Sequence, residues 1–270
     1  MTSVVRDWLR PERPQAPEPV ADALERRRLK IELLIVFSVT LGLSGARSLL
    51  SLIDSLLRPV PLSKQQVALN APQAAASLID LLAQLLSAIE LFAWGALGAY
   101  LLVRGGIRLA AVGLDRLRPG RDALWGAGLA ALIGVPGLGL YFVSWKLGFS
   151  LAVEPSILDD TWWRPIALVA SAAGNAFAEE VLVIGYLLTR LRQLGLRENA
   201  GLLSAAVLRG SYHLYQGFGG FVGNLIMGLV FGRVWQRTNR LWPLIVAHTI
   251  LDVVSFVGYA LLRGHVSWLP

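Results

Sequence analysis

The sequence predicts an all-α protein, a polytopic transmembrane helical bundle of about seven spans with its N-terminus inside. Composition is the first observation: 55% of the 270 residues are hydrophobic, only 16% are charged, and the mean hydropathy is +0.57. A soluble domain carries roughly 25% charged residues. The other two observations are long apolar runs and basic residues that gather in alternate connections. The chain has no cysteine, which excludes disulfides and thiolate chemistry.

The apolar runs are long enough to cross a bilayer, whose hydrocarbon core of about 30 Å needs about 20 residues of helix. They cover residues 31–53, 76–103, 123–145, 165–188, 200–215, 217–235 and 242–262. The fifth and sixth runs are short and nearly continuous, so we expect them to form a tight helical hairpin. No run alternates with the period of two that is typical of membrane β-strands.

The basic residues set the expected orientation. Eighteen of the 25 lie in the N-terminal arm and in the connections after the second, fourth and sixth runs, while five lie in the alternate segments. Lysine and arginine are retained on the cytoplasmic side. We therefore expect an integral, multi-pass protein of the plasma (inner) membrane, with its positive charge explained by topology in the lipid bilayer and not by nucleic acid.

Ionisable residues inside the runs need an explanation, because each costs at least about 2.5–3.5 kcal/mol on insertion. Glu32, Arg47 and Asp80 lie toward span ends, where side chains can reach the interface. Glu90 lies in mid-span with no evident partner. The remaining polar residues concentrate in the last four runs and are Asn175, Glu179, Glu180, Arg209, His213, His248 and Asp252.

Helical spacing brings these residues toward one site. His213 follows Arg209 by four positions and Asp252 follows His248 by four, so each pair shares a helix face. At a rise of about 1.5 Å per residue, Glu179 and both histidines reach overlapping depths. Adjacent glutamates point about 100° apart, so only one is expected to face a given point. We expect a polar cavity in the cytoplasmic half, reached from the cytoplasm or laterally from lipid.

Several chemistries use a carboxylate with two imidazoles. The set can activate a water for hydrolysis. It can also bind zinc with one coordination position left open, and the candidate ligands are then Glu179, His213 and His248. Proton relays in transporters use the same residue types. The residues alone leave these readings open.

The order of the motifs resembles one family. Glu179-Glu180 is followed by Gly185-Tyr186, then by His213 at the end of a short run, then by His248-x-x-x-Asp252. Over residues 117–262 this is similar to the CAAX protease and bacteriocin-processing family of intramembrane proteases (CPBP, or Abi), whose pattern is EExxxR, FxxxH and Hxxx(N/D). The resemblance implies a catalytic Glu179-Glu180 pair in which Glu179 is the general base.

The same resemblance implies roles for the other motif residues. His213 would share the water, and His248 with Asp252 would support the oxyanion. In a metalloprotease version, the glutamate and histidines would bind zinc. The chain also departs from the pattern. Ile184 occupies the position of the arginine in EExxxR, and Arg209 occupies the position of the phenylalanine in FxxxH. Spacing suggests that Arg209 takes the missing arginine's place, with Asn175 as a further supporting residue.

The expected domains follow from this reading. Residues 1–30 form a cytoplasmic Pro/Arg-rich arm, residues 31–104 two accessory transmembrane helices, and residues 105–264 the peptidase core. The expected function is hydrolysis of a peptide bond in a membrane-associated or prenylated-type protein or peptide. The alternatives are a catalytically silent membrane scaffold or immunity protein of the same family, which the loss of the motif arginine favours, and a small proton-coupled transporter.

Overall fold

The structure, a computed structural model, describes residues 17–263 and residue 265. Most of the expected arm, residues 1–16, lies outside the described residues. The helices are α2 (Ala23–Val39), α3 (Leu41–Leu57), α4 (Ser77–Arg104), α5 (Pro119–Lys146), α6 (Arg164–Glu179), α7 (Leu188–Gln193), α8 (Glu198–Ser211), α9 (Phe218–Thr238) and α10 (Trp242–Leu262). Short 3-10 turns cover Leu62–Lys64, Leu109–Val112 and Leu214–Gln216. A π-helix, η3 (Glu180–Leu187), continues α6 into α7.

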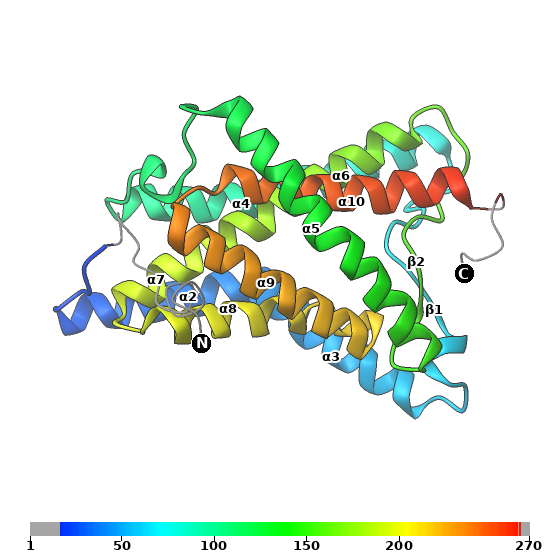
Figure 1. Cartoon of the computed structure of the whole chain (residues 1–270), viewed down its shortest axis with the longest axis horizontal. Coiled ribbons are helices and arrows are strands. Elements are labelled where there is room, and N and C mark those ends of the chain that lie inside the picture. Colours follow the sequence, from blue (N-terminus) through cyan, green and yellow to red (C-terminus); the bar gives the residue numbers. More distant parts are fainter. Residues whose placement is uncertain (1–16, 264, 266–270) are drawn as a thin grey trace.

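The long helices run between two ends of the molecule (Figure 1). The connections 105–118, 194–197 and 239–241 form what we call the Arg-rich end. The connections 58–76 and 147–163 form the sheet end, which carries β1 (Gln66–Ala68) and β2 (Ala152–Glu154). These strands pair in parallel, with Gln66 opposite Ala152. The described chain is thus all-α apart from one small sheet.

Five helices of the described chain are long and apolar enough to cross a membrane, or six if α2 and α3 count as one bent span. The polytopic all-α prediction is confirmed, but the count of seven is not. The first predicted run breaks at Thr40, where α2 and α3 meet at 50°. The fifth yields only the 14-residue α8, about 21 Å long and shorter than the hydrocarbon core. The orientation stays a prediction.

The end of α8 explains why the fifth run is short. The chain leaves the helix at Tyr212, and Gly217 then adopts φ +97°, a left-handed conformation that favours glycine. The predicted hairpin follows, because α9 packs back along α8. At Gly228 an added Cβ would lie 3.0 Å from the Cα of Ala206, so the two helices are in close contact.

Close contact between α4 and α6 positions the middle of α6. At Gly174 an added Cβ would lie 2.9 Å from the carbonyl oxygen of Ala88. At Gly95 it would lie 2.5 Å from the ring of Phe177. The predicted accessory helix α4 therefore lies directly against the helix that carries Glu179.

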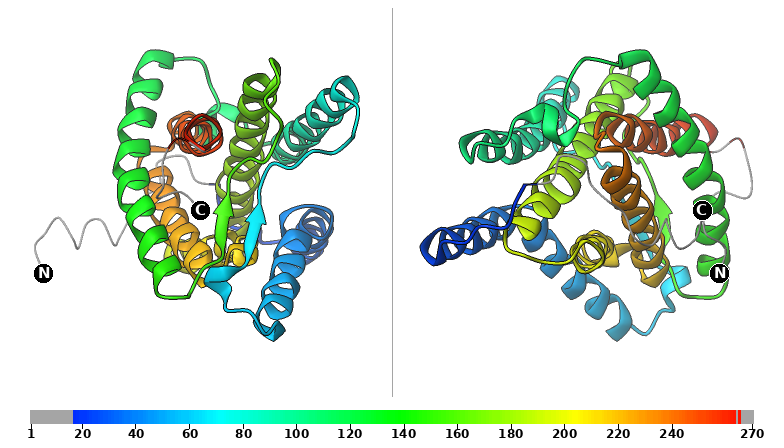
Figure 2. Two further views of the ribbon diagram at one scale, coloured as in Figure 1. Left: turned by 90° about the vertical axis from the view of Figure 1, so that its right-hand side faces the viewer. Right: turned by 60° about the vertical axis from the view of Figure 1, so that its left-hand side comes forward.

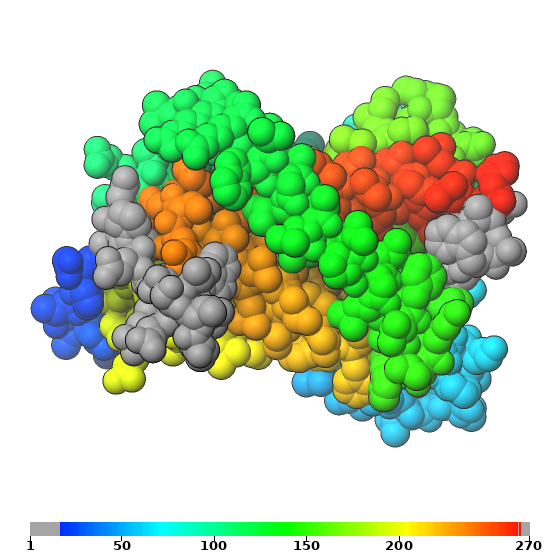
Figure 3. Space-filling model, viewed as in Figure 1, coloured from blue at the N-terminus to red at the C-terminus, as the bar shows by residue number. Residues whose placement is uncertain are grey.

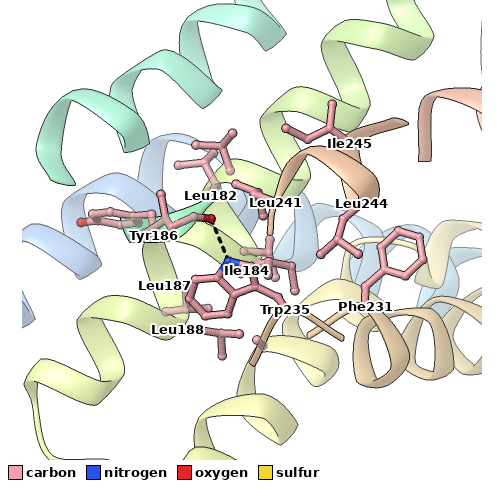
Figure 4. Close-up of a cluster of buried hydrophobic side chains, with 14 of the residues drawn as sticks. Leu182, Ile184, Tyr186, Leu187, Leu188, Phe231, Trp235, Leu241, Leu244 and Ile245 are labelled. Atoms are coloured by element: carbon pink, nitrogen blue, oxygen red, sulfur yellow. Dashed lines mark hydrogen bonds between the residues drawn. The ribbon is translucent and has the colours of Figure 1, made fainter. Parts of the chain in front are cut away.

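Apolar side chains fill the interior toward the Arg-rich end. All eight residues of η3 are buried. Figure 4 shows Ile184 of η3 among Phe231, Trp235, Leu241 and Leu244, and all five side chains are fully buried. The Nε1 of Trp235 donates to the carbonyl of Val112 at 3.0 Å, which ties α9 to the connection after α4.

Two of the in-span ionisable residues have hydrogen-bond partners within the protein. Glu32 accepts from the Tyr186 hydroxyl at 2.8 Å and from Arg190 Nε at 2.9 Å. Asp80 is buried and accepts from the Gln73 backbone amide at 2.7 Å. Their roles are structural.

A charge cluster at the Arg-rich end predicts a pH-dependent contribution to stability. Arg240 donates a hydrogen bond to Asp122 at the start of α5. It also donates from Nη1 to Asp115 Oδ2, at 2.6 Å. The hydrogen bond from Arg240 lowers the pKa of Asp115. We expect Arg240→Gln to reduce the free energy of unfolding by about 1–3 kcal/mol at pH 7. Because the folded pKa is lowered, this contribution is complete above the unfolded value of about 3.9 and is lost as pH falls through the folded pKa.

Urea unfolding in detergent at pH 7 and at pH 3 measures this difference. The exposed Arg108→Gln is the control, since no described residue pairs with Arg108. An Arg240→Gln defect of equal size at both pH values would show that the ion pairs are not its cause.

Candidate active site

Glu179 and Glu180 lie where α6 passes into the π-helix η3, with 3% and 0% of their surfaces exposed. π-helical turns inside α-helices are frequent at functional sites. Both carboxylates face one nitrogen, Nη2 of Arg209, at 3.3 Å from Glu179 Oε2 and 2.7 Å from Glu180 Oε1. The expectation that only one glutamate faces a given point is therefore wrong, because the guanidinium lies between the two.

Arg209 is fully buried on α8, with its Cζ 5.6 Å above the ring centre of Phe231. Its Nη2 also lies 3.0 Å from Nδ1 of His248. A buried cation compensates the charge of buried carboxylates, which are costly alone. Ile184, which occupies the position of the motif arginine, is fully buried among apolar side chains. This geometry agrees with the hypothesis that Arg209 supplies the cation missing at Ile184.

His248 and Asp252 extend the network along α10. His248 Nδ1 lies 2.9 Å from Glu180 Oε1, and its Nε2 lies 3.6 Å from Asp252 Oδ2. Asn175, one turn before Glu179 on α6, donates to Asp252 Oδ2 at 2.9 Å. The structure thus joins six of the seven sequence-derived residues through contacts between α6, η3, α8 and α10.

His213 is the exception. It is half-buried, and its Nδ1 lies 3.0 Å from the carbonyl oxygen of Arg209 in its own helix turn. Its ring contacts those of Tyr212 and Tyr215, with ring centres 4.8 and 6.4 Å away. No hydrogen bond joins His213 to either glutamate in the described chain.

Tyr212 is a site residue that was not predicted from the sequence. Its hydroxyl donates to Glu179 Oε2 at 2.8 Å, and its backbone carbonyl accepts from Ser48 of α3 at 2.8 Å. A tyrosine in an apolar run is ordinarily read as packing. Its position three residues after Arg209, on the same helical face, was the available signal.

The predicted zinc ligands do not form a metal site in this arrangement. In residues 17–263, no group of three or more His, Asp or Glu side chains could hold a metal ion. The guanidinium of Arg209 lies against both carboxylates. The donor set of Glu179, His213 and His248 therefore does not fit zinc in this arrangement.

A comparison with protein families identifies the stretch that carries this site. The family model described as type II CAAX prenyl endopeptidase Rce1-like matches residues 161–254. The match contains every residue of the candidate site and confirms the resemblance predicted from the motifs. Together with the apolar helices, it indicates an integral multi-pass membrane protein related to proteases. No curated protein and no solved structure matches the chain.

Proposed function

We propose that this chain, whose residues 161–254 match the CAAX prenyl endopeptidase family, is an intramembrane endopeptidase. It hydrolyses a peptide bond in a membrane-associated or prenylated-type protein or peptide, and Glu179 activates the water. The observation that carries the proposal is the pair of buried glutamates held by Arg209, Tyr212 and His248.

The two oxygens of Glu179 support its role as general base. Oε2 accepts from Tyr212 and faces Arg209, which fixes the carboxylate. No described residue donates to Oε1, so that oxygen can accept a hydrogen bond from water. Glu180, in contrast, is fully buried with Oε1 on Arg209 and His248 and with Oε2 sealed from solvent. Glu179 is therefore the base and Glu180 positions the cation and imidazole.

The two histidines and Asp252 complete the proposed reaction. Glu179 removes a proton from the water as the water attacks the scissile carbonyl, and in this proposal His213 shares that water. Collapse of the tetrahedral intermediate then breaks the C–N bond, and the proton passes from Glu179 to the leaving amine. His248 is the candidate donor to the oxyanion that forms. Asp252 would oppose that charge, and its hydrogen bond from Asn175 offsets part of this effect.

Purified protein and a library of membrane-associated peptides, with and without a prenyl group, test the proposal. We expect cleavage by the wild type, loss of cleavage in His213→Ala, and full activity with a chelator present. Abolition by the chelator would require a metal mechanism. Equal cleavage by His213→Ala would show either that His213 takes no part or that a contaminating protease is responsible.

A silent scaffold or immunity protein is the second candidate, because Ile184 replaces the motif arginine. It predicts that the cellular phenotype of a deletion is restored by Glu179→Gln as well as by the wild-type chain. An endopeptidase predicts restoration by the wild type alone.

A further inference from the structure

Helix α3 packs directly on the segment that carries Tyr212, although it lies outside the residues 161–254 that match the protease family. It contacts the end of α8 and the 3-10 turn Leu214–Gln216. The left view of Figure 2 shows α3 and α5 on opposite sides of the molecule. In Figure 3, α5, α9 and α10 form the face toward the viewer, and only an edge of α3 emerges behind them. Helix α3 therefore supports the end of α8 from the side that α5 does not cover.

The buried face of α3 consists largely of small residues, which permits a close approach to α8. Its buried residues recur every three or four positions and are Leu41, Gly45, Ser48, Leu52 and Ser55. At Gly45 an added Cβ would lie 2.7 Å from the hydroxyl oxygen of Ser211, the last residue of α8. Small residues at such an interface let two helix backbones come close together. A side chain of α3 can therefore reach the backbone at the end of α8.

Ser48 makes that contact. Its hydroxyl donates to the backbone carbonyl of Tyr212 at 2.8 Å, and both residues are buried, at 6% and 5% exposed. Tyr212 is the residue at which the chain leaves α8. The last carbonyls of a helix have no partner within it, so a donor from another element is needed where they are buried. Ser48 supplies one and holds the peptide unit at which the chain turns.

The same tyrosine reaches the proposed general base with its other end. The Tyr212 hydroxyl donates to Oε2 of Glu179 at 2.8 Å. Because the aromatic ring is rigid, a rotation of the backbone at Tyr212 displaces the hydroxyl at the far end of the ring. The two hydrogen bonds therefore form one connection, from Ser48 of α3 through Tyr212 to the Glu179 carboxylate.

We infer that Ser48 is a positioning residue for the proposed general base. By holding the peptide of Tyr212, it keeps the tyrosine hydroxyl on Oε2 and thereby fixes the orientation of the Glu179 carboxylate. The inference deepens the proposed function and rests on it for the role of Glu179. It gives α3, expected to be an accessory helix, a part in completing the site.

Threonine and valine have nearly the same shape, but only threonine has a hydroxyl, so the pair isolates the hydrogen bond. In the full chain, Ser48→Val should lower kcat for peptide cleavage by about 3–10-fold at unchanged KM, the kinetic equivalent of one neutral hydrogen bond. Ser48→Ala, which adds no volume, should behave in the same way, and Ser48→Thr should retain most of the wild-type kcat. The acid limb of the pH–rate profile should move in Ser48→Val as it does in Tyr212→Phe.

Ser55→Val is the matched control, because Ser55 lies on the same face of α3, is 5% exposed, and has no described hydrogen bond to the site. It should leave kcat and the pH–rate profile unchanged. Equal kcat in Ser48→Thr and Ser48→Val would overturn the inference, whether both values are normal or both are reduced. So would a pH–rate profile of Ser48→Val that keeps its wild-type position, since a defect of packing alone leaves it there.

Unfolding in detergent tests the connection without turnover. The variants are Ser48→Val, Tyr212→Phe and the two combined, and residues of one hydrogen-bond network show non-additive effects in such a cycle. We expect Tyr212→Phe to lower the unfolding midpoint less in the Ser48→Val background than in the wild type. Additive shifts would overturn the inference. Coupled shifts in a chain that cleaves no peptide would count against the proposed function alone, so the two failures are distinguishable.

Discussion

Replacement of Arg209 by methionine is expected to lower the free energy of unfolding by about 3–5 kcal/mol, the usual cost of removing one partner of a buried ion pair. Arg209 is 0% exposed, and its guanidinium is within 3.3 Å of both Glu179 and Glu180. Methionine retains most of the side chain's length but leaves two neighbouring carboxylates buried without a cation. Unfolding in detergent, followed by far-UV circular dichroism, measures the loss.

A second buried arginine provides the control. Arg233 on α9 is 5% exposed, and it donates to the amide oxygen of Asn199 at 2.6 Å without an ion pair to a carboxylate. Arg233→Met should cost markedly less than Arg209→Met. Equal losses would mean that the packing of the arginine stem, and not its charge, stabilises the site.

A paired substitution tests whether the cation can return to the motif position. Ile184 and Arg209 both contact the region of Phe231, and Glu180 Oε2 is buried without a partner. Arg209→Phe with Ile184→Arg restores the family pattern, so the pair should be more stable than Arg209→Phe alone. A pair less stable than the single variant would contradict an exchange of roles.

Glu179→Gln is expected to lower kcat by about 10²–10⁴-fold, the typical contribution of a general base, with little loss of stability. Stability is retained because Arg209 keeps its shorter contact with Glu180, at 2.7 Å. Glu180→Gln should show the opposite balance and cost about 3–5 kcal/mol, because it leaves Arg209 buried without its nearest carboxylate. Peptide cleavage and unfolding measured on both variants separate the two roles.

Tyr212→Phe serves as the matched control for Glu179. It removes one hydrogen bond to Oε2 while the carboxylate remains, so kcat should fall far less than in Glu179→Gln. If Glu180→Gln abolished cleavage in a stable protein while Glu179→Gln did not, the assignment of the base would be reversed.

Hydropathy could predict most of the fold because the length of an apolar run sets whether a helix can span a bilayer. It could not predict the bend at Thr40 or the early end of α8 at Ser211. Both depend on local backbone geometry and on neighbouring helices. The partners of Glu32 and Asp80 likewise could not be predicted, because only the packed structure shows them.

Spacing could predict that His248 and Asp252 share a face of one helix, but His213 lies beyond the end of α8, the helix that carries Arg209. Spacing could not predict how the helices turn toward one another. The position of Arg209 between both glutamates and the Tyr212 hydrogen bond depend on tertiary contacts. A one-dimensional pattern carries no information on those contacts.

The parallel pairing of β1 with β2 constrains the order in which the molecule assembles. A parallel pair needs a long crossover connection, and here that connection contains α4 and α5. During synthesis β1 emerges first and has no strand to pair with until both helices have been made and inserted. Pairing between distant segments is also slow, since loop closure precedes it. The small sheet therefore forms late, after the membrane helices that lie between its two strands.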